Sequence, residues 1–470
     1  MLVDYLGVPP LKSNPLDSLT VGELGVVYEA VIALGDHVSR KRNGQYFTPD
    51  DVSQMIVEKS LDFDQGTWID PCCGVGNLAW HLVRIQDDPS EFARHRLFLN
   101  DLDEVALKCA VVLIVASFAG EGDQDFLVHL SSRSSNRDFL DRSVTFDADY
   151  VVMNPPYVRV SPRAEFDTAR AGDLYAYFME QAALNHKGFI SITPASYTAA
   201  AKFSPLRRLL LEKFDNIESI VFDNVPDTVF RGFKYGSVNS SNVNFVRGCV
   251  TVCGGRRSGR WITPILRWRS HSRSRMFQEH RAFLSPLEIN RDDVWVKLMP
   301  ETRELWFQAS SWSRVLRDLT IVGPSDFFLE IATTPRYYIS ASTRPLDRSS
   351  KVTLYFAGKE ERNAALVAVN SSLVYWWWRS LDGGITLKKS TLLSCPIPDR
   401  IENVATEELV RMLLRSEASG LVTKLNAGKV NENIKHSPAV VRLLDEQIFG
   451  DEWEFSRLYE PDLPATLSGG

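Results

Sequence analysis

The sequence lacks the features that mark membrane, disulfide-rich or repeat proteins. Only 6 of its 470 residues are cysteine, too few for a disulfide framework, and the C-x₃-C pair Cys249 and Cys253 has no second pair to complete a zinc site. The longest apolar run, residues 109–119, is too short to cross a bilayer. The N-terminus lacks the basic start and apolar core of a signal peptide. We therefore expect a cytoplasmic protein, a monomer, with no membrane association and no bound metal.

The chain also lacks a strong charge of either sign. Its formal net charge is −6, with 44% hydrophobic and 24% charged residues, which is typical of a globular protein. Such a balance excludes a uniformly basic coat for nucleic acid, although a local basic face stays possible. A length of 470 residues predicts two or three domains.

The first half alternates between short β-rich runs and helical patterns. The runs lie at residues 66–70, 96–101, 126–130, 149–153, 188–194 and 217–223. This alternation predicts an α/β fold with a doubly wound, mostly parallel sheet. Three of the strands end in Asp70, Asp101 and Asn154. Because ligands bind at the carboxyl ends of parallel strands, these side chains are expected to share one crevice.

The character changes near residue 250, where eight arginines stand against one acid, Glu279, within residues 253–281. The arginines are interpreted either as a solvated surface segment or as contacts to phosphates. Beyond them the alternation is lost and aromatic residues are dense, and the run "VYWWWRS" is typical of a core. We predict a first domain over residues 1–255 and a second, mixed α+β domain over residues 256–470.

The segment "IDPCCGVGNLAWHLV" predicts a strand ending at Asp70, a turn through Gly74 and Gly76, and a helix from about Asn77. Glycines let the backbone approach a ligand closely. The G-x-G-x-x-G pattern of dinucleotide sites is incomplete, since Ala79 stands at its last position. The turn therefore favours a ligand with a carboxylate and no phosphates.

Asp101 ends the next strand, where a carboxylate can accept hydrogen bonds from both hydroxyls of a ribose. Asp103 is the better helix N-cap, which leaves Asp101 for a ligand. Upstream, Thr48 is a good N-cap before Pro49, whereas capping does not explain Tyr46 and Phe47.

The apolar run that ends in Asn154-Pro155-Pro156-Tyr157 is the most informative stretch. Prolines alone could end the strand, since they have no N–H to donate. The Asn154 amide oxygen and the Pro155 carbonyl can accept the two hydrogens of an exocyclic amine, while the Tyr157 ring stacks on the ring that bears the amine. Drawing both N–H bonds toward acceptors favours a pyramidal nitrogen whose lone pair can attack.

The segments "GQYFTP", "DPCCGVGN" and "NPPY" together resemble the gamma-type adenine-N6 DNA methyltransferases of restriction–modification systems. The resemblance covers about residues 40–250, and it continues more loosely to a segment near residue 400 that looks like the end of a DNA-recognition domain. It implies the cofactor S-adenosylmethionine, duplex DNA as partner, and a target adenine flipped out of the helix.

By this resemblance, Tyr46, Phe47 and Thr48 line the methionine end of the cofactor. Asp70, Gly74 and Gly76 form its cradle, and Asp101 holds its ribose. Asn154, Pro155 and Tyr157 hold the adenine, with Phe245 as a second aromatic side chain on the base, unless Phe245 is a core residue. Either Ser131 or Asp138 contacts the adenine of the cofactor.

Two other functions stay open from the residues alone. One is methylation of another planar amine or amide, such as guanine N2 in RNA or a protein glutamine, and the other is a DNA-binding subunit without catalysis. With about forty residues before "GQYFTP", we expect no N-terminal nuclease domain, and we expect any restriction endonuclease to be separately encoded.

Overall fold

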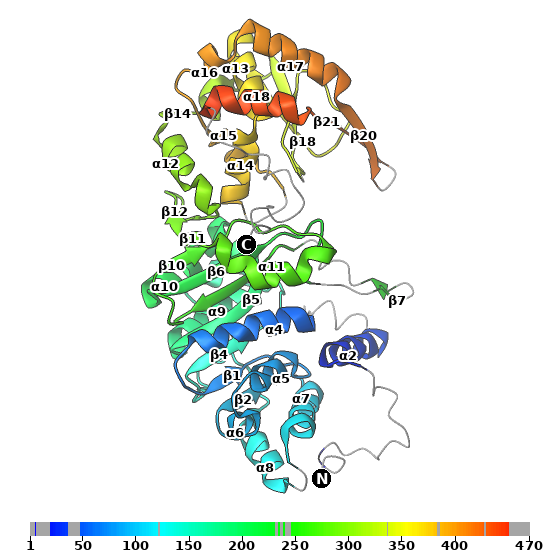
Figure 1. The fold of residues 1–470 in the computed structure, drawn as a ribbon, viewed down its shortest axis with the longest axis vertical. Coiled ribbons are helices and arrows are strands. Elements are labelled where there is room, and N and C mark those ends of the chain that lie inside the picture. The colour runs from blue at the N-terminus through cyan, green and yellow to red at the C-terminus, as the bar shows by residue number, and fades with distance from the viewer. Residues whose placement is uncertain are drawn as a thin grey trace. The chain divides into compact units, whose positions relative to one another are not determined.

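The computed structural model describes residues 5, 19–35, 48–120, 123–230, 234–235, 238–239, 246–335, 337–382, 386–426 and 429–450. The chain divides into two compact units, drawn in Figure 1. The first comprises Met1–Leu266 and Arg273–Trp295, and the second comprises Arg267–Ser272 and Val296–Gly470. The predicted boundary after residue 255 thus lies inside the first unit. The assignment of cofactor binding to one domain and DNA reading to the other stays a prediction.

A nine-stranded sheet forms the centre of the first unit. Its order is β11 (Ser285–Pro286), β10 (Arg260–Ile262), β6 (Ile217–Phe222), β9 (Gly248–Cys253), β5 (Gly188–Pro194), β4 (Tyr150–Met153), β1 (Trp68–Asp70), β2 (Leu97–Asn100) and β3 (Ser134–Ser135). The pairs are parallel except that β9 runs antiparallel to β5 and β6, and β11 runs antiparallel to β10. The predicted α/β class with a mostly parallel sheet is confirmed.

Both faces of this sheet are buried. Ile69 and Val151 belong to a core cluster with side chains of α9 (Leu174–Asn185) and α10 (Ser204–Lys213). Their neighbours Trp68, Tyr150 and Val152 are also buried, and because side chains alternate along a strand they face the other side. On that side α4 (Asp50–Glu58) packs beside α5 (Asn77–Arg84). A doubly wound sheet requires covering on both faces.

The remaining helices complete the layers of the first unit. They are α2 (Val21–Gly35), α6 (Pro89–His95), α7 (Glu104–Phe118), α8 (Gln124–Ser132) and α11 (Arg273–Glu279), and in Figure 1 α4 and α11 lie on the near side of the sheet. Short ladders pair β7 (Lys234–Tyr235) with β8 (Val238–Asn239) and β12 (Glu288–Ile289) with β13 (Trp295–Val296).

One predicted strand is wrong. Residues 126–130 belong to the helix α8, not to a strand. The Asp123 side chain caps the helix by accepting a hydrogen bond from Phe126 N at 3.1 Å. Phe126, Leu127 and Leu130 are buried, a spacing that gives one face of a helix, whereas the uninterrupted apolar run 126–128, taken alone, also fits a short buried strand. The short apolar run was therefore ambiguous, and the cap at Asp123 decides in favour of the helix.

Two of the eight arginines in residues 253–281, Arg267 and Arg273, are buried, and four others are exposed. Arg273 is 4% exposed, forms an ion pair with Asp51 of α4, and donates to the backbone oxygens of Thr228 and Val229. Arg267, in the second unit, is 6% exposed and donates to the Tyr375 hydroxyl at 3.0 Å. Arginines with such contacts hold segments of the chain together, and neither the solvated nor the phosphate-binding interpretation describes these two.

A buried ion pair joins three segments of the first unit. Lys59, in the 3₁₀ turn η1 (Lys59–Asp62), lies with its Nζ 2.5 Å from Glu218 Oε1 of β6 and 2.7 Å from His280 Nε2 of η7 (His280–Phe283). The two side chains of the pair are 3% and 5% exposed. Burial lowers the pKa of His280 to about 3, so the ring is neutral and can accept a hydrogen bond from the ammonium.

The second unit is a mixed α+β structure. An antiparallel sheet has the order β15 (Thr320–Ile321), β18 (Lys351–Phe356), β16 (Phe328–Ala332), β17 (Ala341–Ser342), and separate ladders join β14 (Arg314–Val315) to β19 (Pro396–Ile397) and β20 (Leu421–Asn426) to β21 (Lys429–Ile434). Its helices are α12 (Arg303–Ser311), α13 (Lys359–Asn370), α14 (Ser372–Leu381), α15 (Lys389–Leu393), α16 (Ile401–Val404), α17 (Glu407–Ser419) and α18 (Pro438–Phe449).

The tryptophan run of the second unit lies in α14, where Trp376, Trp377 and Trp378 are 2%, 7% and 0% exposed. The prediction that this run is core is confirmed. No helix in the described part of the chain is long and apolar enough to cross a membrane.

Replacing Lys59 with methionine is expected to destabilise the protein by about 3 kcal/mol, because Glu218 stays buried without its ammonium partner. The double variant Lys59→Met/Glu218→Gln should recover part of this loss, since no charge is then buried at that place. Urea unfolding of the full chain measures both effects as shifts of the midpoint. Equal midpoints for the single variant and the parent would show that the pair contributes nothing.

Candidate active site

A cavity of about 550 Å³ opens at the carboxyl ends of β1, β2 and β4. Asp70 ends β1, Asp101 follows β2 and Asn154 follows β4, and all three line this cavity together with Thr48 and Gly74. Their convergence follows from the parallel pairing of β1 with both neighbours, which brings the three strand ends to one edge. A volume of several hundred cubic ångströms is typical of a site for a small molecule or cofactor.

The turn after β1 needs glycine at two positions for different reasons. Gly74 has φ +54°, and a Cβ there would meet no atom within 4 Å, so the turn exposes its backbone to open space. Gly76 has φ +94°, and a Cβ there would lie 2.9 Å from Ala110 Cβ of α7. The first glycine thus leaves room for a ligand, and the second lets the turn pack against a helix.

The Asp101 carboxylate has a second task that sequence reasoning did not foresee. Asp103 caps α7 as predicted, since its Oδ1 accepts from Val105 N at 2.9 Å and Ala106 N at 3.2 Å. The Asp101 carboxylate nevertheless forms hydrogen bonds within the protein. Its Oδ2 accepts from Gly74 N at 2.7 Å, and its Oδ1 accepts from Asp103 N at 2.8 Å. These bonds tie the end of β2 to the glycine turn of β1. Each carboxylate oxygen has a second lone pair, so the group can still accept from a ligand.

The cavity lining is acidic. Among the described residues, it contains the carboxylates of Asp70, Asp101, Asp103 and Asp138 and one basic side chain, Arg137. Burial raises the pKa of Asp70 to about 8 and also raises the pKa of Asp101. A cationic ligand would lower the cost of ionising these groups, whereas a pyrophosphate would be repelled by them. The electrostatics therefore agree with the incomplete phosphate motif.

The Asn154 side chain is oriented by hydrogen bonds from both sides. Its Nδ2 donates to Thr48 Oγ1 at 2.8 Å, and its Oδ1 accepts from the Tyr157 hydroxyl at 2.7 Å. The Tyr157 hydroxyl also lies 2.9 Å from the Ile192 carbonyl oxygen of β5. Since a hydroxyl has one hydrogen, it can donate to only one of these acceptors at a time.

Thr48 does not cap α4, contrary to the prediction. The N-cap of that helix is Pro49, without a side-chain hydrogen bond, and the Thr48 hydroxyl accepts from Asn154 instead. Thr48 is itself held, because Asn77 Nδ2 donates to its carbonyl oxygen at 2.6 Å. On the other side of the turn, Cys72 Sγ lies 3.5 Å from the Asn154 carbonyl oxygen. The strand-end amide is thus fixed by segments from three parts of the sequence.

Five other residues predicted to bind the cofactor or the target adenine do not line the cavity or lie outside the described residues. Tyr46, Phe47 and Phe245 lie outside the described residues. Pro155 is buried, and it is Pro156 that lines the cavity. The Tyr157 ring packs edge-on against Phe230, with the ring centroids 5.7 Å apart.

The structure bears on the choice between Ser131 and Asp138. Ser131 lies within α8, whereas Asp138 and its neighbour Phe139 line the cavity. The Phe139 ring stacks on Phe178, with centroids 5.3 Å apart, and both contribute to the apolar part of the lining. Asp138 is therefore the better candidate for a contact to an adenine ring.

Sequence reasoning missed a contribution from α2. Gly25 and Tyr28 line the cavity, and the Tyr28 hydroxyl donates to Asp103 Oδ2 at 2.8 Å. Burial and this bond raise the pKa of Tyr28, so it is a neutral donor. In the sequence, only the spacing of Gly25 and Tyr28, three positions or about one helical turn, could have indicated this contribution. That spacing is too common to identify a site. Within the described residues, no group of three or more His, Cys, Asp or Glu side chains is placed to hold a metal.

The sheet order, the antiparallel strand between β5 and β6, and the glycine turn between two strand-end carboxylates define the fold of S-adenosylmethionine-dependent methyltransferases. Residues 21–188, which contain most of this cavity, match the model of the N-6 DNA methylase family. This part of the chain is an N-6 DNA methylase domain, and the resemblance to the adenine methylases of restriction–modification systems is confirmed at that level.

Two curated relatives are similar over part of the chain. The type I restriction enzyme MjaIX methylase subunit of Methanocaldococcus jannaschii is 28% identical over 134 residues, 28% of this chain and 22% of the relative. The type II methyltransferase M.VspI of a Vibrio species is 23% identical over 223 residues, 44% of this chain and 50% of the relative. The chain thus spans half or less of the length of these relatives.

Solved structures with similar folds include a DrdV–DNA complex, with 14% identity, coverage of 66% of this chain and 37% of that chain, and a TM-score of 0.45. The type IIG restriction endonuclease BpuSI is 11% identical, with coverage of 92% and 66% and a TM-score of 0.40.

Replacing Asp70 with asparagine should change how stability depends on pH. With a pKa of about 8, Asp70 binds a proton in the folded chain that the unfolded chain has already lost. Its stabilising contribution is therefore complete below the ordinary pKa of an aspartate and is lost as the pH rises through about 8. Between pH 6 and pH 8, the free energy of unfolding of Asp70→Asn should rise relative to that of the parent by roughly 2 kcal/mol. Thermal unfolding at these pH values without ligand measures this, and parallel pH profiles would contradict it.

Proposed function

We propose that this chain transfers a methyl group from S-adenosylmethionine to the N6 amino group of an adenine in duplex DNA, as part of a restriction–modification system. One observation carries the proposal: the Asn154 amide is oriented by Thr48 and Tyr157 at the end of β4, in the same cavity as the acidic cradle. The match of residues 21–188 to the N-6 DNA methylase family supports this assignment.

The residues present fit the cofactor. Methylases of this family use S-adenosylmethionine, which supplies a methyl group on a positively charged sulfur. An acidic lining suits its sulfonium and ammonium charges, and the open space at Gly74 leaves room beside the turn. Asp70 and Gly74 would form the cradle, Gly76 would support it by letting the turn pack against α7, and Asp101 would accept hydrogen bonds from the ribose hydroxyls. Asp138 and Phe139 would lie against the adenine ring of the cofactor.

The amide of Asn154 would hold the target amine. An amide oxygen can accept two hydrogen bonds, so Oδ1 can receive an amine N–H beside the Tyr157 hydroxyl, or after that hydroxyl turns to the Ile192 carbonyl. Thr48 keeps Nδ2 turned away, which prevents the amide from presenting a donor to the amine. The N6 nitrogen of the target adenine would attack the methyl carbon through its lone pair as the bond from that carbon to sulfur breaks. Positioning of the amine would provide most of the acceleration.

The DNA substrate implies base flipping, because N6 of a paired adenine cannot reach a cavity inside the protein. Extrusion costs a few kcal/mol, which contacts to the DNA must offset. The printed names of the two relatives, a type I methylase subunit and a type II methyltransferase, support DNA as the substrate and a restriction system as the setting. A separately encoded endonuclease and the role of the second unit in reading DNA belong to the same proposal.

The decisive experiment incubates the purified full chain with S-adenosylmethionine and duplex DNA of mixed sequence, then measures N6-methyladenine by mass spectrometry of the digested DNA. Parallel reactions contain RNA and a protein mixture. Methyl groups on guanine N2 or glutamine, with none on adenine, would favour the alternative substrates. DNA binding without methylation of any substrate would leave a non-catalytic subunit.

Asn154→Ala should reduce kcat for DNA methylation by about a hundredfold or more, because the amine loses its acceptor. Cofactor affinity should stay nearly unchanged, since the amide contacts the base. Thr48→Val, which keeps the shape of the side chain but removes the acceptor of Nδ2, should lower kcat by about tenfold through loss of orientation. Calorimetry and single-turnover kinetics separate the two effects. Normal turnover of Asn154→Ala would refute the assigned role.

Asp101→Asn should weaken binding of S-adenosylmethionine by about tenfold or more, because a charged acceptor for the ribose is lost. Asp103→Asn is the matched control, since asparagine caps a helix as well as aspartate and the residue lines the same cavity. Titration calorimetry compares the two variants. An equal loss of affinity in both would place the ribose contact elsewhere.

A further inference from the structure

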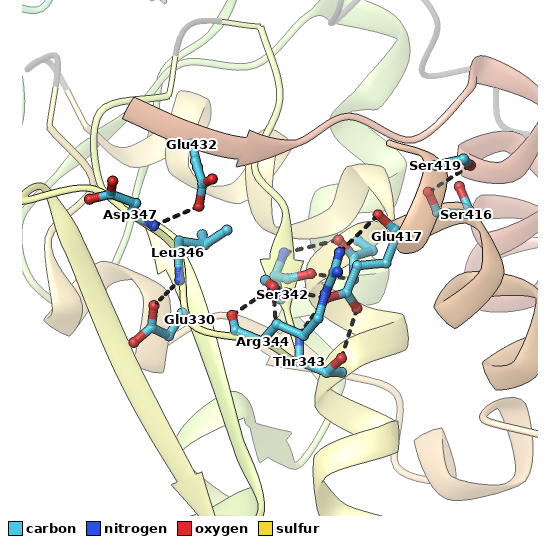
Figure 2. Close-up of polar contacts among 12 residues, drawn as sticks. Glu330, Ser342, Thr343, Arg344, Leu346, Asp347, Ser416, Glu417, Ser419 and Glu432 are labelled. Carbon is cyan, nitrogen blue, oxygen red and sulfur yellow. Dashed lines mark hydrogen bonds and ion pairs between the residues drawn. The ribbon is translucent and has the colours of Figure 1, made fainter. Parts of the chain in front are cut away.

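The second unit contains a loop whose backbone is bound by three separate elements. Residues 342–350 connect β17 to β18. Thr343 N donates to Glu417 Oε1 of α17 at 2.9 Å, Leu346 N donates to Glu330 Oε2 of β16 at 2.6 Å, and Asp347 N donates to Glu432 Oε2 of β21 at 2.7 Å. Figure 2 shows these three carboxylates arranged around the loop.

The strongest of the three anchors is Glu417, which is 3% exposed. Besides Thr343 N, it accepts from Ser342 Oγ at 2.8 Å and from Thr343 Oγ1 at 2.9 Å. Figure 2 shows both of its oxygens directed at the loop. A buried carboxylate is costly unless it is fully hydrogen-bonded, and here the loop itself provides the donors.

The other contacts fix the rest of the loop. Leu346 is 3% exposed and packs into the core. Lys351 Nζ joins the Glu330 carboxylate at 2.8 Å to the Leu346 carbonyl oxygen at 2.6 Å. Pro345 has a fixed φ, and as the residue before a proline Arg344 is itself restricted to extended conformations. A surface loop is ordinarily the most variable part of a domain, and this one is held from three sides.

The loop holds one arginine in a defined place at the surface. Arg344 Nη2 lies 3.4 Å from the Glu417 carbonyl oxygen, and Nε lies 3.6 Å from Glu417 Oε1. The side chain is nevertheless 54% exposed. Figure 2 shows it extended alongside Glu417 at the end of α17. Two guanidinium nitrogens thus rest against the end of α17 while about half of the side chain stays accessible, and a side chain held in one place is what preorganised recognition requires.

The elements that hold the loop carry further exposed cations. Arg415 lies on α17, Lys424 on β20, and Lys435 directly after β21, and all three are exposed. Within residues 342–350 the only acid is Asp347. With the three anchoring glutamates and Asp347 counted as acids, this surface has six basic side chains, the three above with Arg344, Arg348 and Lys351, against four acidic ones, whereas the whole chain has a net charge of −6. The partner of this surface should be a polyanion.

We propose that residues 342–350, which we call the anchored loop, form a DNA-reading element in which Arg344 contacts a base in the major groove. The inference rests on the proposed function, because it takes duplex DNA as the polyanion. Arginine is the side chain best suited to guanine, whose O6 and N7 both accept. Phosphate contacts position a protein on DNA without reading its sequence, whereas contacts to base edges carry the sequence information, and a side chain held in one place suits the second task.

The test uses the full chain. Adenine methylation by the parent is first mapped to define the recognised sequence, and kcat/KM is then measured on that site and on sites with one base pair changed. Arg344→Ala should reduce the discrimination at one base pair by about tenfold or more, while methylation persists. The slope of DNA affinity against salt should change little. Arg411→Ala is the matched control: Arg411 lies on α17, away from the anchored loop in sequence, is 67% exposed, and pairs with Glu407 one turn away.

A second variant tests the anchoring. Glu417→Gln keeps the size of the side chain but leaves fewer acceptors for the three loop donors, so the same base pair should be read less strictly while Arg344 is present. If Arg344→Ala keeps full discrimination but lowers the salt slope by about one, Arg344 contacts a phosphate and the base-reading role is refuted.

Unchanged discrimination and unchanged salt slope in Arg344→Ala would refute a DNA contact altogether. If the parent methylates no DNA, the proposed function fails first. DNA affinity measured by fluorescence anisotropy then tests the anchored loop separately. Arg344→Ala should bind DNA more weakly than the parent, and equal affinity would refute a contact between the loop and DNA.

Discussion

The parallel pairing of β1 with β2 and β4 is the constraint on which the candidate site depends. It brings Asp70, Asp101 and Asn154 to one edge of the sheet, although they are 84 positions apart along the chain from first to last. The two bonds from Gly74 N and Asp103 N to Asp101 then connect the neighbouring turns. Once these turns are joined, the cavity has acids on one side and the Asn154 amide on the other.

Hydrogen bonds from outside the sheet complete the site. Thr48 precedes α4, and its hydroxyl accepts from the Asn154 amide, so the orientation of a strand-end group depends on a helix that begins more than 100 residues earlier. Asn77 in turn holds the Thr48 carbonyl. Helix α4 is itself anchored to β6 through Lys59 and Glu218 at its C-terminal end.

Charged groups are used differently in the two units. In the first, four carboxylates line the described part of the cavity, which suits a positively charged ligand, and Arg273 holds α11 against α4. In the second, the carboxylates of Glu330, Glu417 and Glu432 accept backbone N–H groups of one loop, and the nearby cations stay at the surface. A negative lining thus surrounds the cavity of the first unit, and exposed cations lie on the elements that hold the anchored loop of the second.

The sequence alone predicted the fold class and the edge of the sheet at which the candidate cavity lies. Alternating strands and helices, the glycine turn after Asp70 and the polar ends of three strands required a parallel sheet with a ligand at one edge, because strand direction follows from the connections. It could not decide the helix over residues 124–132, since a short apolar run fits both periods, nor that residues 256–266 and 273–295 belong to the first unit. Only the tertiary structure showed that Thr48 orients Asn154 instead of capping α4, that α2 contributes Tyr28, and that three distant glutamates hold the anchored loop. Each of these depends on side chains from remote segments meeting in space, and no local pattern records which donor will meet which acceptor.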